Sequence, residues 1–104
     1  EYILCNNAGW WDEYHDVDGY YCEQRLIFHS DGRGEESIIR HNSDIPGDFK
    51  EFKYDFYWEW DDDYYGSIYM EYSNGDYVIF DNLRIYFDEL SGYLGDDYVT
   101  FEPF

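Results

Sequence analysis

The chain has 104 residues, 44% of them hydrophobic and 25% aromatic, and a formal net charge of -19. This length suffices for one domain with a hydrophobic core and is too short for two ordinary ones, so we expect a single domain over residues 1–104. The acidic balance excludes a broad basic face for nucleic acid or an anionic membrane surface. No apolar run approaches the ~20 residues of a transmembrane helix. A cleaved leader, or a lipid anchor on an upstream Cys of the precursor, is compatible with the sequence.

Short runs that alternate between apolar and polar side chains predict β-strands separated by turns rich in Gly, Asn and Asp. In chain order the predicted strands are Trp10–Trp11, Tyr20–His29, Glu36–Arg40, Phe52–Trp60, Ser67–Ser73, Tyr77–Phe80, Leu83–Phe87, Leu90–Leu94 and Tyr98–Phe101. The clearest of them is Phe52–Trp60, and Asn74-Gly75 is a strong signal for a type I′ hairpin turn. The one helical alternative is Asp88–Tyr93, which Gly92 disfavours.

Antiparallel strands that follow one another through short links favour a meander of about eight strands. Residues 12–19 and 41–48 are predicted as loops between such strands. We therefore predict an all-β fold closed as a small β-barrel, with an open β-sandwich as the alternative. Closure is favoured because an open meander this rich in aromatic residues would leave an adhesive edge.

Several motifs follow one another along most of the chain. They are Gly9-Trp10, Phe28–Gly34, Phe56–Trp60, Ile68–Tyr72 with Asn74-Gly75-Asp76, Leu90–Leu94 and Val99–Phe101. In order and spacing they resemble the small lipocalin-like lipoprotein domains of Bacteroides and related gut bacteria, over Trp10–Phe101. The resemblance implies a lipocalin-like β-barrel in an extracytoplasmic protein that is periplasmic, secreted or an outer-membrane lipoprotein. It implies no assigned ligand and transfers no functional residue to this chain.

Cys5 and Cys22 are the two cysteines of the chain. Their separation fits a disulfide that closes a first hairpin, which would stabilise the fold by about 3 kcal/mol if unstrained. The alternative is a pair of buried thiols that act as small apolar side chains. Sequence alone leaves both open, because it does not show whether the two Cα atoms come within reach.

No catalytic, cofactor or metal site is predicted from the motifs. Residues 12–19 superficially resemble a calcium-binding loop, but Arg25 stands where the EF-hand pattern requires an acid. Asp61-Asp62-Asp63 is interpreted as a solvated turn. His15, His29 and His41 lie in or beside separate turns without metal-ligand spacing. We therefore expect a protein that is not an enzyme, and a glycan hydrolase is the least favoured hypothesis.

The aromatic residues offer the main functional hypothesis. One set lies on a single face of the predicted strands and would form either the barrel core or a stacking surface for a sugar or small apolar ligand. These candidate ligand-binding residues are Tyr54, Phe56, Trp58, Trp60 and Tyr72. Tyr57, Tyr69 and Tyr86 would point outward. We expect a binding or cell-envelope interaction domain, with an acidic protein-binding or inhibitor-like module as the alternative.

Overall fold

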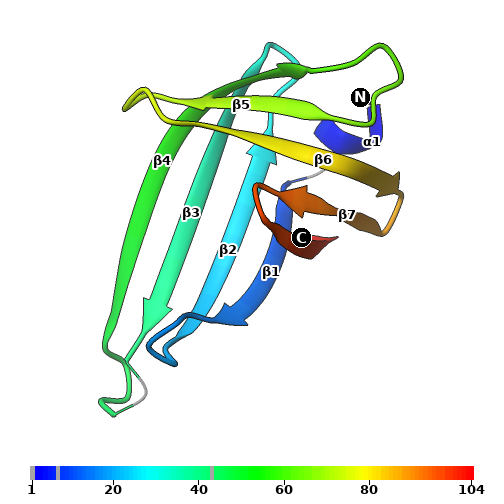
Figure 1. Ribbon diagram of the computed structural model, residues 1–104. Coiled ribbons are helices and arrows are strands. Elements are labelled where there is room, and N and C mark those ends of the chain that lie inside the picture. Colours follow the sequence, from blue (N-terminus) through cyan, green and yellow to red (C-terminus); the bar gives the residue numbers. More distant parts are fainter. Residues whose placement is uncertain (1, 7, 43) are drawn as a thin grey trace.

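The computed structural model describes residues 2–6, 8–42 and 44–104, which form one short helix and eight strands (Figure 1). The elements are α1 (Tyr2–Cys5), β1 (Trp10–His15), β2 (Tyr21–Phe28), β3 (Arg33–His41), β4 (Phe49–Trp60), β5 (Ile68–Tyr72), β6 (Tyr77–Tyr86), β7 (Glu89–Leu94) and β8 (Asp97–Pro103). Each strand pairs antiparallel with the next, and β1 pairs with β8 to close a barrel. The predicted all-β barrel is confirmed, and the open sandwich is wrong.

Alternation along the strands places the core inside the barrel. In β2 every second residue is buried, from Cys22 to Phe28, because successive side chains of a strand point to opposite faces. The cross-strand register brings Phe28 opposite Gly34 and Gly34 opposite Phe56. The core comprises Leu4, Trp10, Leu26, Phe28, Phe56, Trp58, Ile68, Met70, Phe80, Leu90 and Phe101.

Two strands differ most from their prediction, while β3 and β4 each begin three residues before the predicted Glu36 and Phe52. β1 continues to His15, although residues 12–19 were expected to form a loop, because Asp12–His15 pair with β2 despite their polar side chains. Tyr77–Tyr86 is one strand rather than two. The register of its pairing with β7 shifts between Asp81 and Arg84, and Asn82 has a φ of 52°. A β-bulge therefore replaces the expected break at Asp81-Asn82.

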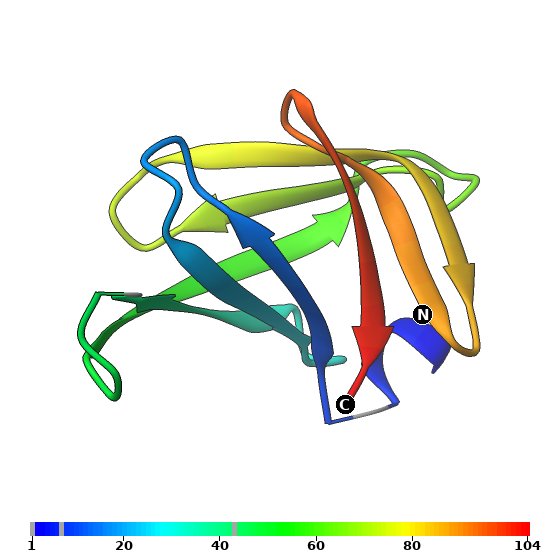
Figure 2. The same cartoon turned by 90° about the horizontal axis from the view of Figure 1, so that it is seen from below.

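The two ends of the barrel differ. At one end α1 covers the interior, and Trp10 Nε1 donates a hydrogen bond of 3.0 Å to the Leu4 carbonyl oxygen. At the other end β1 and β8 diverge beyond Trp11, as Figure 2 shows. The helix found among the described residues is too short to cross a membrane. The fold thus presents one filled end and one open end.

Candidate functional site

The candidate site is the inner surface of β1–β4 at the open end of the barrel. β1 pairs with β8 only at Trp10 and Trp11, and β4 pairs with β5 only from Phe56 onward. Beyond these points the four strands continue as a curved sheet, and no other strand of the described residues continues opposite them (Figure 1). We call this region the open half. Its inner side chains are Asp12, Tyr14, Cys22, Gln24, Glu36, Ile38, Arg40, Lys50, Phe52 and Tyr54.

A buried polar network lies where the filled core meets the open half. Glu36 is 7% exposed, and its Oε2 accepts a hydrogen bond of 2.5 Å from Gln24 Nε2. Glu36 Oε1 accepts a second hydrogen bond, of 2.8 Å, from the Tyr72 hydroxyl. Burial and the adjacent Glu36 charge raise the pKa of Tyr72 far above its ordinary value, so Tyr72 stays a donor.

Aromatic side chains form the wall of the open half on the β4 side. Phe52 and Tyr54 are 41% and 39% exposed, whereas Phe56, next on the same face, is 2% exposed. Tyr54 packs edge-on against Tyr72, with ring centroids 6.2 Å apart. The inner face of β4 therefore changes from core to accessible surface between Phe56 and Tyr54. Accessible rings beside buried hydrogen-bonding groups suit a ligand that is partly apolar.

A cavity of about 600 Å³ opens where β1 and β8 diverge. It is lined by Asp12, Tyr14, His15, Asp16, Val17, Gln24, Leu94, Asp97, Tyr98 and Val99. Partial burial raises the pKa of Asp12, and the charges of Glu13 and Glu102 add to this shift. Burial, with Cys22 as a neighbour, raises the pKa of Tyr14 to about 12. Gln24 lines this cavity and donates a hydrogen bond to Glu36, so the polar network borders the cavity.

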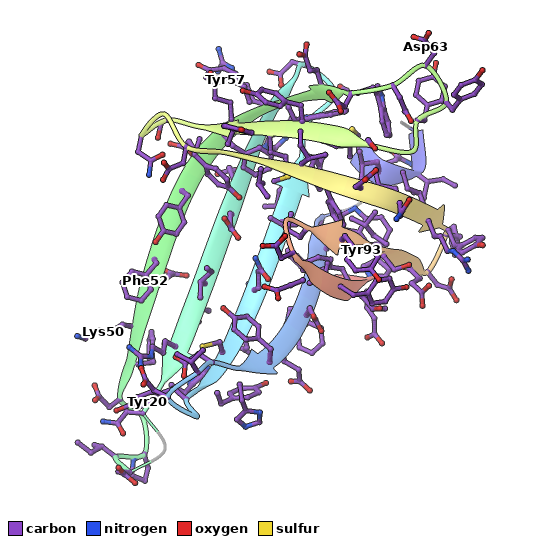
Figure 3. The ribbon with its side chains drawn as sticks, viewed as in Figure 1. Tyr20, Lys50, Phe52, Tyr57, Asp63 and Tyr93 are labelled. Carbon is purple, nitrogen blue, oxygen red and sulfur yellow. The ribbon has the colours of Figure 1, made fainter. Side chains whose placement is uncertain are left out.

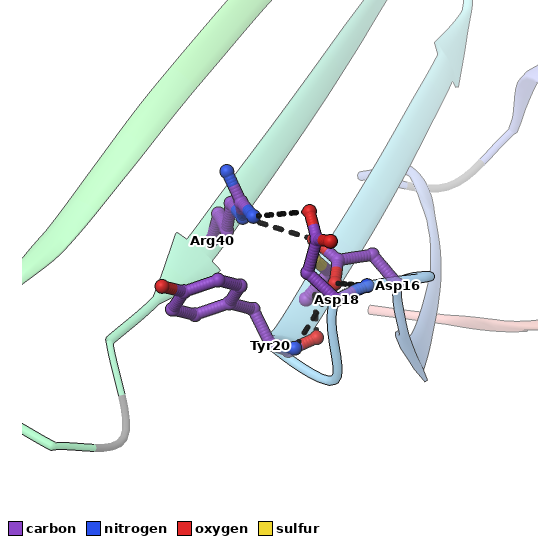
Figure 4. Close-up of polar contacts among 5 residues, drawn as sticks. Asp16, Asp18, Tyr20 and Arg40 are labelled. Atoms are coloured by element: carbon purple, nitrogen blue, oxygen red, sulfur yellow. Dashed lines mark hydrogen bonds and ion pairs between the residues drawn. The ribbon is translucent and has the colours of Figure 1, made fainter.

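An ion-pair cluster closes the rim of the site at the tip of the β1–β2 hairpin (Figure 4). Arg40 Nε lies 2.9 Å from Asp16 Oδ2, and the Arg40 guanidinium lies 4.0 Å over the Tyr20 ring. Asp16 Oδ1 also accepts hydrogen bonds from the backbone amides of Asp18 and Tyr20. Asp18 Oδ2 lies 3.4 Å from Arg40. The guanidinium that faces the open half is thus already engaged by protein carboxylates.

The predicted site residues separate into two groups. Phe56 and Trp58 are buried core residues. Trp60 packs on Tyr65 at the filled end of the barrel, with ring centroids 5.0 Å apart. Tyr54 and Tyr72 contact each other beside Glu36. Only these last two, of the five predicted residues, border the open half. The other predicted group, Tyr57, Tyr69 and Tyr86, lies on the alternate face, where Tyr57 and Tyr86 are exposed.

Sequence reasoning missed Glu36 and Gln24. Both stand on the inner face of their strands, in register with apolar neighbours: Gln24 follows Cys22 and precedes Leu26, and Glu36 lies opposite Leu26. A polar residue that interrupts an apolar face is the signal that identifies them. Burying a carboxylate without a partner is costly. Such an interruption therefore marks a position where the fold supplies hydrogen-bond partners to a buried polar side chain.

The disulfide considered between Cys5 and Cys22 is not formed in the structure. Cys5 belongs to α1 at the filled end of the barrel. Cys22 lies in the open half, where it is opposite Tyr14 and Arg40 in the strand register. The Cys22 thiol lies 3.7 Å from the Tyr20 carbonyl oxygen. Burial and the nearby Asp16 charge raise the pKa of Cys22, so the thiol rather than the thiolate is favoured.

Within the described ranges, no group of three or more His, Cys, Asp and Glu side chains is placed to hold a metal ion. A comparison with protein-family models, curated proteins and solved structures found no match to this chain. The geometry of the open half is therefore the basis for assigning a function.

Proposed function

We propose that the chain is an exported, non-enzymatic, lipocalin-like domain that binds a small ligand in the open half of its barrel. The observation that supports this most directly is the placement of Glu36. Its carboxylate is buried and satisfied by Gln24 and Tyr72, yet a buried ionic group is weak evidence for stability. A group that costs stability and lies beside accessible aromatic rings is better explained by ligand recognition.

The lining defines the ligand chemistry. The Gln24 amide oxygen and the carboxylates of Asp12, Asp16 and Asp97 are acceptors, and the described residues that line the cavity between β1 and β8 include no Lys or Arg. These groups favour a neutral or cationic ligand that donates hydrogen bonds, and they repel an anion. Phe52 and Tyr54 provide the apolar wall for the rest of the ligand. The raised pKa of Cys22 supports binding over nucleophilic catalysis, because the thiolate is the nucleophile.

A set of three matched probes tests the proposal. Phenethylamine, 2-phenylethanol and phenylacetate share a ring and differ in carrying a cationic, neutral or anionic head. We expect the first two to bind more tightly than phenylacetate, measured by ligand-observed NMR titration. Tyr54→Ala should weaken binding by about tenfold, while Tyr57→Ala, on the outer face of the same strand, should not. Equal binding to both variants, or no binding of any probe, would contradict the proposed site.

Export is the second part of the proposal. It is supported by the resemblance of the ordered motifs from Trp10 to Phe101 to the lipoprotein domains of gut bacteria. Expression of the full precursor in a bacterial host, followed by separation of cytoplasmic, periplasmic and membrane fractions, tests it. Recovery of the folded domain in the cytoplasm alone would contradict export, and it would leave the ligand-binding proposal standing.

A further inference from the structure

One edge of the sheet is unpaired in the open half. β4 continues to Phe49 along β3, but its pairing with β5 ends at Phe56. Every residue from Phe49 to Asp55 is exposed. In Figure 3, Lys50 and Phe52 lie along this edge, and none of the strands formed by the described residues lies beyond them. An exposed strand edge presents unpaired backbone groups that can pair with another chain.

The hydrogen bonds that flank this edge show which residues present those groups. Trp58 N donates to the Gly32 carbonyl oxygen, on the β3 side. Asp55 O accepts from Ser73 N, on the β5 side. Backbone groups of successive residues in a strand point alternately to its two neighbours. Lys53 and Glu51, which are two and four residues from Asp55, therefore direct their N–H and C=O groups to the open edge.

The charge of this segment differs from that of the whole chain. Phe49–Asp55 contains Lys50, Glu51, Lys53 and Asp55, so its charges balance, while the chain has a net charge of -19. Glu51 and Lys53 share the outer face, whereas Lys50, Phe52 and Tyr54 share the inner face. A neutral edge on a strongly anionic protein is the place where a second anionic copy meets the least repulsion.

We propose that two copies of this chain associate through their β4 edges, antiparallel, with Phe52 on the two-fold axis. In this register Glu51 of each copy faces Lys53 of the other, and both residues direct their backbone groups to the shared edge. The resulting ladder is continuous with the sheets of both barrels. Opposite charges directly across an antiparallel pair are stabilising. On the inner face Phe52 meets its own symmetry mate, and Lys50 meets the ring of Tyr54.

The neighbouring registers are disfavoured by their charges. Centring the two-fold axis on Glu51 places that carboxylate opposite itself. Centring it on Lys53 places two ammonium groups together, and it also sets Glu51 against Asp55. Like charges directly opposite are destabilising. The alternation of charge along the outer face thus selects one register, and self-complementarity is what a two-fold interface requires.

Lys residues on an edge strand often prevent edge-to-edge pairing. They do so because like charges then face one another across the pair. Here Glu51 lies between Lys50 and Lys53 in the sequence, and each Lys53 faces Glu51 of the second copy. The association must still overcome the repulsion between two chains of charge -19. We therefore expect a weak dimer that strengthens between about 0.05 and 0.3 M salt, as long-range repulsion is screened.

Charge reversal at Glu51 and Lys53 tests the pairing. Sedimentation equilibrium at up to about 1 mM protein measures the dimer dissociation constant. Glu51→Lys and Lys53→Glu each replace the cross-strand attraction with repulsion, and each should raise the dimer dissociation constant by at least about tenfold. The double variant Glu51→Lys/Lys53→Glu restores opposite charges across the axis and should restore dimerisation. Both side chains are on the surface, so folding is retained and is checked by circular dichroism.

Glu59→Lys is the matched control. It makes the same charge change on the outer face of the same strand, at a position where β5 already covers the edge, and it should leave the dimer intact. A monomer at all concentrations and salt conditions would overturn the proposal. So would a dimer that Glu51→Lys does not weaken, or a double variant that stays monomeric. Capture of an extended peptide by this edge without self-association would likewise assign the edge to a different occupant.

Discussion

The Tyr72 hydroxyl of β5 donates a 2.8 Å hydrogen bond to Glu36 Oε1 of β3, across the interior and past the strand between them. The two strands are not neighbours in the sheet. Tyr72 also packs on Phe56, with ring centroids 5.6 Å apart. This single side chain therefore belongs to the core through its ring and to the polar network through its hydroxyl.

Removing this hydroxyl should destabilise the fold. Tyr72→Phe leaves Glu36 Oε1 buried without its donor, so we expect a loss of about 1–3 kcal/mol in the free energy of unfolding, measured by urea titration. Tyr72→Phe/Glu36→Leu should recover part of this loss, because the buried charge is then gone. The control Tyr86→Phe alters an exposed hydroxyl and should have little effect. An equal loss in Tyr72→Phe and Tyr86→Phe would contradict the role of the network.

The sequence predicts the strands and their inner faces, but not where the opposite wall ends. Alternation places Tyr54 and Phe56 on one face, and both do face inward. Which of the two side chains is covered depends on the length of β5, which pairs with β4 from Phe56 to Trp60. Such long-range geometry is not encoded in the period of β4. The β-bulge in β6 is not predicted from the sequence for a related reason, because Asp81-Asn82 fits a turn between two strands as well as it fits a bulge within one strand.

The boundary between core and binding wall on β4 gives a direct comparison. Phe56→Ala removes a fully packed ring and should cost about 3–5 kcal/mol of stability. Phe52→Ala, on the same face, removes a ring that is 41% exposed and should cost less than about 1 kcal/mol. Thermal and urea unfolding measure both. Similar losses in the two variants would show that the open half is filled in solution.

At Gly34 the barrel core is packed closely against the backbone. A methyl group at this residue would overlap the Phe56 ring and would lie 2.9 Å from the Ile27 carbonyl oxygen. Gly34→Ala should therefore destabilise the fold by about 1–3 kcal/mol or more through overpacking. Gly66→Ala is the control, because its methyl would meet only the movable Asp62 carboxylate, at 3.2 Å. A mild effect at Gly34 would mean that Phe56 can shift freely.

The hairpin tip that forms the rim depends more on Asp16 than on Arg40. Asp16 accepts two backbone hydrogen bonds in addition to its ion pair, whereas Arg40 contributes a partly exposed ion pair of small expected value. Asp16→Ala should therefore cost about 1 kcal/mol or more, and Arg40→Ala less. Hydrogen exchange of the Asp18 and Tyr20 amides should accelerate in Asp16→Ala alone. Acceleration of equal size in Arg40→Ala would assign the order of the tip to the ion pair instead.

Tyr14 should make stability fall at high pH. Its pKa is raised to about 12 in the folded state, chiefly by burial, against about 10 in the unfolded chain. A group whose pKa is raised by folding stabilises the protein below its unfolded pKa, and this contribution is lost as pH rises from about 10 to 12. Tyr21, whose pKa a hydrogen bond to Glu13 also raises to about 12, acts in the same direction. Tyr14→Phe should therefore make the decline of the unfolding free energy with pH shallower without abolishing it. An identical pH profile in Tyr14→Phe and the parent protein would mean that neither the partial burial of Tyr14 nor its Cys22 neighbour opposes ionisation of the Tyr14 hydroxyl.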